Sequence, residues 1–240
     1  MLDDLRQPGT PTLRGIVHCA GGGEFAPVEL LDLASLRREL EVRLVAPIAL
    51  AHGLLPALRR SHGRILLIAT PPLTPLAFNL PIHACDFFLN CLARTLAQEL
   101  EPQGVACVLI RCGAIRTPSQ DRIDAVLAEN LDRWPPQIVD LYRATLEGMR
   151  RNMAAFNAKR SPVDEVANVV EQTLVDPQPP ARVQVGYLSR TAALLELLPQ
   201  GLMDKLLAAR VRSMNKGAHV GASKDTAASA PRIGRREFVQ

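Results

Sequence analysis

Reactive side chains gather at the ends of apolar runs in this chain and at the start of one helical pattern. In chain order they are His18, Cys19, Thr70, His83, Cys85, Asp86 and Cys112. Imidazole, thiol and carboxylate groups that meet could form a Cys–His nucleophile or a His/Cys/Asp metal site. No close spacing motif supports either site, and buried cysteines and hydrogen-bonded histidines are the more common outcome.

The elements that must position these groups alternate regularly. Short apolar runs predict buried strands over 14–20, 64–69 and 105–111, and helical periodicity predicts helices over 35–60 and 81–100. Strand, helix, strand, helix and strand joined by short loops predict an α/β fold with a parallel sheet and right-handed crossovers. Because ligands of such sheets bind at the carboxyl ends of the strands, we expect the reactive side chains to face one crevice.

The rest of the chain predicts a helical region and one more strand. The pattern favours helices over 121–132, 137–156 and 161–175, an edge strand over 182–186, and an amphipathic helix over 190–213 interrupted near Pro199 and Gly201. We therefore expect one domain over 1–215, with a substrate-loop region at 113–160. Small and polar residues predict a disordered tail over 216–240.

Composition excludes several classes of function. The 240 residues are 48% hydrophobic and 22% charged, which is enough for one core, and the net charge of +4 comes from scattered arginines that do not predict nucleic-acid binding. The longest apolar stretch, 44–58, contains Pro56 and is too short for a transmembrane segment. Charged residues directly after Met1 argue against a secretory signal, so we expect a cytoplasmic protein. An odd number of cysteines predicts reduced, buried thiols: Cys19, Cys85, Cys91, Cys107 and Cys112.

Several motifs resemble the short-chain dehydrogenase/reductase family, nearest its retinol and 17-beta-hydroxysteroid dehydrogenase branch. The resemblance covers about residues 13–212. It rests on His18-Cys19-Ala20-Gly21, on the helix stretch 40–44, on the loop from Arg111 to Pro118, and on the segment 162–167. It implies a partial Rossmann-like sheet of four strands, without the first βαβαβ half, flanked by helices.

The resemblance also assigns the catalytic positions. The family's serine, tyrosine, lysine and structural asparagine fall at Thr70, Ile82, Asp86 and Arg43. Isoleucine has no proton to give, and a carboxylate raises a neighbouring phenol's pKa where the family's lysine lowers it. No Tyr-x-x-x-Lys exists in any register, because Tyr142 and Tyr187 are followed four residues later by Leu146 and Thr191.

The cofactor positions are equally incomplete. The resemblance leaves Ala20, Gly21, Gly113 and Thr117 as vestigial cofactor-binding residues. The family's glycine-rich turn lies on a first βαβ unit, and about 13 residues precede strand 14–20 in this sequence. A phosphate loop at 21–23 is disfavoured because Glu24 places a negative charge beside it. We therefore expect no bound cofactor, and NAD(P) under the alternative below.

Three hypotheses follow. The first is a non-catalytic family member that binds an apolar small molecule or a protein and forms a homodimer through helices 35–60 and 81–100. The second is an NAD(P)-dependent oxidoreductase for a hydrophobic alcohol or ketone, completed by a missing N-terminal segment or a partner. The third is a membrane-surface or lipid-binding protein that uses helix 190–213.

Two structural expectations accompany these hypotheses. A buried Arg43 needs a partner, which Asp86 or Glu24 could supply. Strand 14–20 becomes an apolar edge of the sheet, to be covered by the termini or by a partner.

Overall fold

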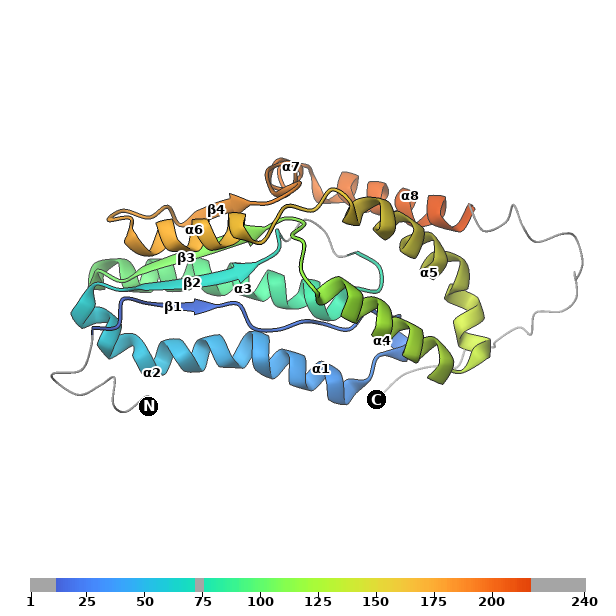
Figure 1. The fold of residues 1–240 in the computed structure, drawn as a ribbon, viewed down its shortest axis with the longest axis horizontal. Helices are drawn as coiled ribbons and strands as arrows, with labels where there is room; N and C mark the ends of the chain where they lie inside the picture. The colour runs from blue at the N-terminus through green and yellow to red at the C-terminus, as the bar shows by residue number, and fades with distance from the viewer. Residues whose placement is uncertain (1–11, 72–75, 217–240) are drawn as a thin grey trace, which may run out of the picture.

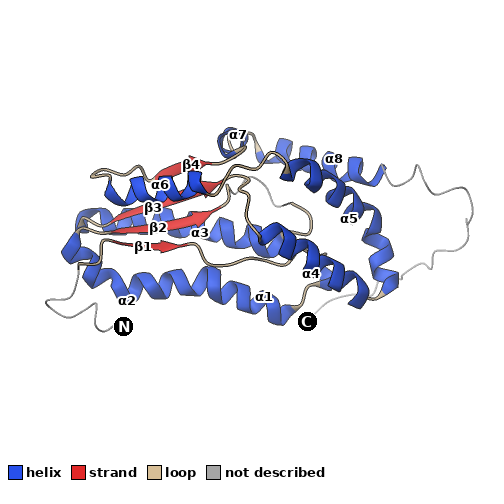
Figure 2. Cartoon of the chain, viewed as in Figure 1, coloured by secondary structure: helices blue, strands red, loops and turns tan. Residues whose placement is uncertain are grey.

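The computed structural model describes residues 12–71 and 76–216, which form a four-stranded sheet with helices on both faces (Figures 1 and 2). The strands are β1 (Gly15–His18), β2 (Arg64–Ala69), β3 (Ala106–Cys112) and β4 (Arg182–Val185). They lie in the order β1-β2-β3-β4, and every neighbouring pair is parallel. The predicted α/β fold with a parallel sheet is confirmed.

Helices cover the sheet as the alternating pattern requires. They are α1 (Leu33–Leu40), α2 (Ala46–Ser61), α3 (Leu80–Leu100), α4 (Ser119–Arg133), α5 (Pro136–Asn157), α6 (Asp164–Val175), α7 (Ser189–Leu195) and α8 (Gln200–Lys216). The predicted helix 190–213 is thus two helices separated near Pro199. The predicted tail over 216–240 lies, from residue 217 onward, outside the described residues.

Two apolar layers hold the sheet between its helices. Ile65 and Leu67 of β2 face α2 and α3, and their neighbour Leu66 faces α6 on the opposite side. This alternation follows from the two-residue period of a strand. Because both faces are covered, the central strands are mostly apolar, with Arg64 and Arg111 near their ends.

The predicted helix 35–60 contains one turn of wider geometry. Glu41–Val45 forms a π-helical turn that joins α1 to α2. Pro47 follows this turn and has no backbone N–H to continue the α-helical hydrogen bonds, which favours such a change. The turn places Arg43 among the buried residues of the protein.

The same helical stretch, Leu33–Ser61, is long and apolar enough to cross a membrane by length and composition alone. Core helices of globular proteins pass this test as well, and Leu54 and Leu58 are buried inside the fold. This observation is weak evidence for a membrane span, and the expected absence of one stays a prediction.

Strand β1 forms one edge of the described sheet. It pairs with β2 alone among the described residues, and Val17 is partly exposed. The predicted apolar edge is therefore present. The expected cover by residues 1–13 or by the tail falls largely outside the described residues.

Candidate active site

Arg43 and Asp86 form a buried ion pair at the carboxyl ends of the strands. Arg43 Nη2 donates to Asp86 Oδ1 at 2.5 Å, and the Asp86 side chain has no exposed surface. Thr70 adds its hydroxyl, which donates to Asp86 Oδ2, and its backbone N–H, which donates to Oδ1 at 3.3 Å. The expectation that Arg43 has an acidic partner is confirmed, with Asp86 and not Glu24 in that role.

The elements around this pair explain its position. Arg43 comes from the π-helical turn, and Glu39 one turn earlier lies 3.7 Å from its Nε atom. Asp86 belongs to the first half of α3, and Thr70 directly follows β2. Three of the four predicted catalytic positions, Arg43, Thr70 and Asp86, thus lie in contact. Their polar groups hydrogen-bond to one another, and this network joins the π-helical turn, the end of β2 and α3.

The fourth position, Ile82, makes an apolar packing contact. A Cβ atom on Gly23 would lie 2.1 Å from Ile82 Cγ1, so the isoleucine packs directly against the loop that follows β1. Gly23 also has a φ of +132°, where glycine is strongly preferred. Ile82 therefore fits closely against Gly23 and supplies no exchangeable proton.

Two buried histidines lie near the Arg43–Asp86 pair. His18 Nε2 and His83 Nδ1 are buried without a hydrogen-bond partner. Burial lowers the pKa of His18 below its ordinary value, and the charge of Arg43 lowers it further. Burial also lowers the pKa of His83, while Asp86 acts in the opposite direction. Burial thus disfavours the charged form of both imidazoles.

These lowered pKa values predict that the protein loses stability in mild acid. The unfolded chain binds protons at both histidines near pH 6.5, whereas the folded chain resists protonation to a lower pH. The histidine contribution to stability is thus present above pH 6.5 and is lost as the pH falls through the folded-state values. Urea unfolding of wild type and of the His18→Gln/His83→Gln variant at pH 5 and pH 7 measures this difference.

The variant is expected to lose less free energy of unfolding between pH 7 and pH 5 than the wild type. The raised pKa of Glu24, described below, acts in the opposite direction in both proteins and cancels in the comparison. Equal losses in the two proteins would contradict the assignment of neutral, buried histidines.

The two buried cysteines of the predicted crevice, Cys85 and Cys112, are poorly suited to act as nucleophiles. Burial raises the pKa of Cys85 to about 11 and that of Cys112 to about 12, so neither is a thiolate near neutral pH. The prediction of five buried thiols is wrong for Cys19 and Cys91, which are exposed. Within the described ranges, no three His, Cys, Asp or Glu side chains are arranged to hold a metal ion.

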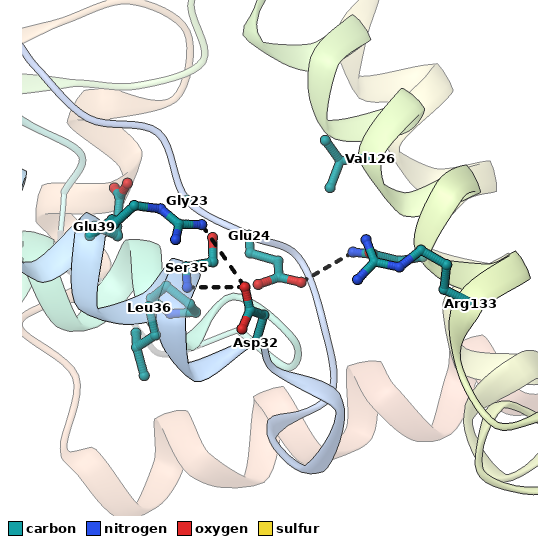
Figure 3. A pocket seen from close by; sticks show the side chains of 11 residues that line it. Gly23, Glu24, Asp32, Ser35, Leu36, Glu39, Val126 and Arg133 are labelled. Atoms are coloured by element: carbon teal, nitrogen blue, oxygen red, sulfur yellow. Dashed lines mark hydrogen bonds and ion pairs between the residues drawn. The ribbon is translucent and has the colours of Figure 1, made fainter.

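A pocket of about 330 Å³ lies between the loop after β1, α1, the start of α3, and α4 (Figure 3). Its wall combines charged and polar groups with apolar surface from Leu36, Pro81 and Val126. Within the predicted substrate-loop region 113–160, α4 supplies one wall through Val126, Asn130 and Arg133. The expected apolar ligand stays a prediction.

Glu24 is the pocket residue best placed for proton transfer. Its Oε1 accepts a hydrogen bond from the buried Asn130 Nδ2 at 3.1 Å, and its Oε2 is buried without a hydrogen-bond partner. Burial raises the pKa of Glu24 above its ordinary value. The hydrogen bond from Asn130, the backbone N–H of Asp32 and the charge of Arg133 lower it, while the negative charge of Asp32 raises it. Figure 3 shows Arg133 reaching from α4 toward the carboxylate of Glu24.

The other carboxylates in this pocket are already engaged. Asp32 caps α1 by accepting the backbone N–H groups of Ala34 and Ser35, as an aspartate at a helix N-terminus does. Glu39 accepts the N–H of Gly22 at 3.0 Å and lies beside Arg43. Glu24 therefore differs from both in having an oxygen with no partner.

An aromatic cluster fixes the loop that carries Glu24. The Ala26 N–H donates to the Phe78 carbonyl at 3.0 Å, and the rings of Phe25 and Phe78 meet edge to face at 5.8 Å. Tyr142 of α5 packs against Phe78 at 5.6 Å. Sequence reasoning considered Glu24 as a partner of Arg43 and missed this pocket. No local motif signals it, because it depends on contacts between residues over 100 positions apart.

The positions that resemble a dinucleotide site do not fit that group by themselves. A Cβ on Gly21 would lie 2.4 Å from Arg43 Cδ, and one on Gly113 would lie 2.1 Å from the Tyr187 carbonyl oxygen, so protein atoms already fill both spaces. Asp86 offers a buried carboxylate where the resemblance expects a ribose-binding cation. Ala20 and Thr117 are exposed. The described residues therefore supply at most part of such a site.

Comparison with known proteins gives one consistent family. The model of the "short chain dehydrogenase" family matches residues 7–127, about half of the chain. 17-beta-hydroxysteroid dehydrogenase type 1 of Mus musculus is 30% identical over 169 residues, which cover 70% of this chain and 48% of that protein. Retinol dehydrogenase 5 of Mus musculus is 28% identical over 207 residues, which cover 83% of this chain and 65% of that protein.

The fold has similar counterparts among solved structures. A short-chain dehydrogenase from Burkholderia cenocepacia J2315, solved in complex with NADP, superposes with a TM-score of 0.60 at 17% identity, covering 81% of this chain and 68% of that chain. The chain spans about half the length of the curated 17-beta-hydroxysteroid dehydrogenase that it matches.

These matches overturn the first hypothesis from the sequence. The matching family model and the curated relatives are named as dehydrogenases. The prediction of a non-catalytic protein is therefore wrong, and the oxidoreductase alternative agrees better with the findings.

Proposed function

Because the chain belongs to the short-chain dehydrogenase family, we propose that it is an NAD(P)-dependent oxidoreductase acting on a hydrophobic alcohol or ketone. The observation that carries the proposal is the pocket beside Gly23 and Pro81, which holds Glu24, a carboxyl group whose pKa burial raises. A 17-beta-hydroxysteroid dehydrogenase and a retinol dehydrogenase among the relatives support the substrate class.

In this proposal Glu24 exchanges the proton of the substrate's hydroxyl or carbonyl oxygen. An acid or base works best when its pKa lies near the operating pH, and burial moves Glu24 in that direction. Asn130 holds one carboxyl oxygen, and Oε2 has no hydrogen-bond partner in the described structure. Because Oε2 is buried, a movement of the Glu24 side chain must expose it before substrate can reach it. Leu36 and Val126 provide apolar contacts for the hydrocarbon part of the substrate.

We propose that the dinucleotide is held mainly by residues outside the described part of the chain or by a partner subunit. This agrees with the occupied spaces at Gly21 and Gly113, and with the edge of β1, which has no neighbouring strand among residues 12–71 and 76–216. The contribution of the described residues is to shape the substrate pocket and to hold its proton-exchanging group.

Titration of the protein, expressed from its complete gene, with NADH and NADPH tests this proposal. Binding is followed by cofactor fluorescence, and turnover is then assayed with a 17-keto steroid, with retinal and with acetoacetate as a hydrophilic comparison. Binding in the micromolar range and reduction of a hydrophobic ketone are expected. Absence of both binding and turnover would contradict the proposed function.

We also propose a homodimer through the region of 35–60 and 81–100. Apolar side chains remain exposed there on neighbouring helices: Val45, Ile48 and Phe87. A Phe87→Glu substitution is expected to weaken self-association at least tenfold, because it buries a charge in an apolar interface. Sedimentation of wild type and variant over a range of concentrations measures this effect, with the exposed Leu141→Glu of α5 as the matched control. A monomeric wild type would contradict the dimer.

A further inference from the structure

The segment α7–α8 carries five exposed leucines, which we call the leucine ridge: Leu194, Leu195, Leu197, Leu202 and Leu206. Leu194 is 67% exposed and Leu197 is 80% exposed, and Leu202 and Leu206 are nearly half exposed. In Figure 1, α7 and α8 lie along the edge of the molecule opposite α1 and α2. An apolar ridge of this length on a protein surface indicates an interaction site.

The ridge is distinct from the face of α8 that packs on the protein. Met203, Leu207 and Val211 recur at four-residue spacing and are half-buried, and Met214 completes this face as a buried residue. Met214 fits against Gly148 of α5, where an added Cβ would lie 2.8 Å from Met214 Cβ. Leu202 and Leu206 lie on a different side of the helix, so packing of α8 does not account for them.

Basic side chains flank the ridge on α8. At 3.6 residues per turn, Lys205 and Arg212 lie on one side of the Leu202–Leu206 line, and Arg210 lies on the other. All three are exposed. Asp204 is the acidic residue of α8, and Glu196 after α7 is already paired with the buried Arg111. The exposed charge beside the leucines is therefore mainly positive.

We propose that the leucine ridge binds an anionic lipid surface, with α8 lying in the plane of the membrane interface. Leucines between basic side chains are the arrangement that such helices use, since the apolar side chains enter the acyl boundary while the cations meet lipid headgroups. Binding of a second copy of this chain would require acidic groups opposite the basic side chains. The surroundings of the leucine ridge carry mainly positive charge and do not supply them. The proposal is independent of the oxidoreductase activity.

Co-sedimentation with vesicles tests the inference on the full chain. Phosphatidylcholine vesicles are compared with vesicles of phosphatidylcholine and phosphatidylserine, using wild type and two variants, Leu202→Gln/Leu206→Gln and Leu194→Gln/Leu197→Gln. Leu141→Gln, which removes an exposed leucine of α5, is the matched control. Circular dichroism melting verifies that each variant is folded.

Wild type and Leu141→Gln are expected to bind the anionic vesicles, and each double variant to bind at least tenfold more weakly. Binding to phosphatidylcholine alone is expected to be weaker as well, because the basic side chains then lose their lipid counter-charges. Failure of wild type to pellet, equal pelleting of wild type and both folded double variants, or equal binding to both vesicle types would overturn the proposal. Loss of a dimer in the double variants without any change in vesicle binding would also overturn it, because it would identify a second copy as the occupant.

Discussion

Replacing Asp86 with alanine is expected to lower the free energy of unfolding by about 3–5 kcal/mol. The substitution leaves Arg43 as a buried charge without its closest partner, and it removes the acceptor for the Thr70 hydroxyl and N–H. Burying a cation without a counter-charge costs far more free energy than burying the intact ion pair. Urea unfolding followed by circular dichroism measures the loss.

Two comparisons separate this explanation from a general effect of removing an aspartate. Asp140→Ala breaks an exposed pair in which Arg143 Nη2 lies 2.7 Å from the carboxylate, and it is expected to cost less than about 1 kcal/mol. The double variant Arg43→Met/Asp86→Leu removes both charges and is expected to recover most of the stability lost in Asp86→Ala. A loss in Asp86→Ala no larger than that in Asp140→Ala would contradict the structural role of the pair.

Replacing Glu24 with glutamine is expected to lower kcat by about 10²–10⁴-fold under the proposed function. Glutamine keeps an oxygen for the Asn130 hydrogen bond but has no proton to exchange at the pH of the assay. Stability is expected to change little, so the effect should appear in turnover and not in the folded fraction. Steady-state kinetics with the best ketone of the panel measures it.

The pH profile gives a second readout for the same residue. Ketone reduction needs the protonated carboxyl, so its rate is expected to fall as the pH rises through the raised pKa of Glu24, and alcohol oxidation should show the reverse. The groups that face this carboxyl are Asn130 and Arg133 of α4 and Asp32 before α1. Asp32→Asn, which keeps a helix-capping residue, is the control: it removes the smaller charge contribution of Asp32 and should shift the profile slightly toward lower pH while retaining turnover. Retention of full turnover by Glu24→Gln would show that another group exchanges the proton.

The strands could be predicted from the sequence because the pattern that defines a buried strand lies in neighbouring residues. Apolar runs bounded by Gly63, Pro71 and Gly113 define β2 and β3, and burial on both faces makes such runs continuous. Helix positions were predicted within a few residues for the same reason. The π-helical turn at 41–45 was not predicted, because it depends on two effects together. Pro47 cannot donate a backbone hydrogen bond, and Arg43 pairs with Asp86, which is distant in the sequence.

The candidate site was only partly predictable. The Arg43–Asp86 pair followed from charge and burial, since a buried guanidinium requires a carboxylate. The role of Glu24 did not follow, because its raised pKa comes from burial that α4 and the aromatic contacts of Phe78 create. The exposure of Cys19 was missed as well, since an apolar neighbourhood in sequence does not fix which side of a strand end faces water.

The proposal that this protein is an oxidoreductase is tested most directly by NADPH-dependent reduction of a hydrophobic ketone. Wild type and Glu24→Gln, expressed from the complete gene and purified identically, are compared so that a contaminating reductase contributes equally to both. Turnover by the wild type together with its loss in the variant is the predicted result. No turnover in either protein, or equal turnover in both, would contradict the account.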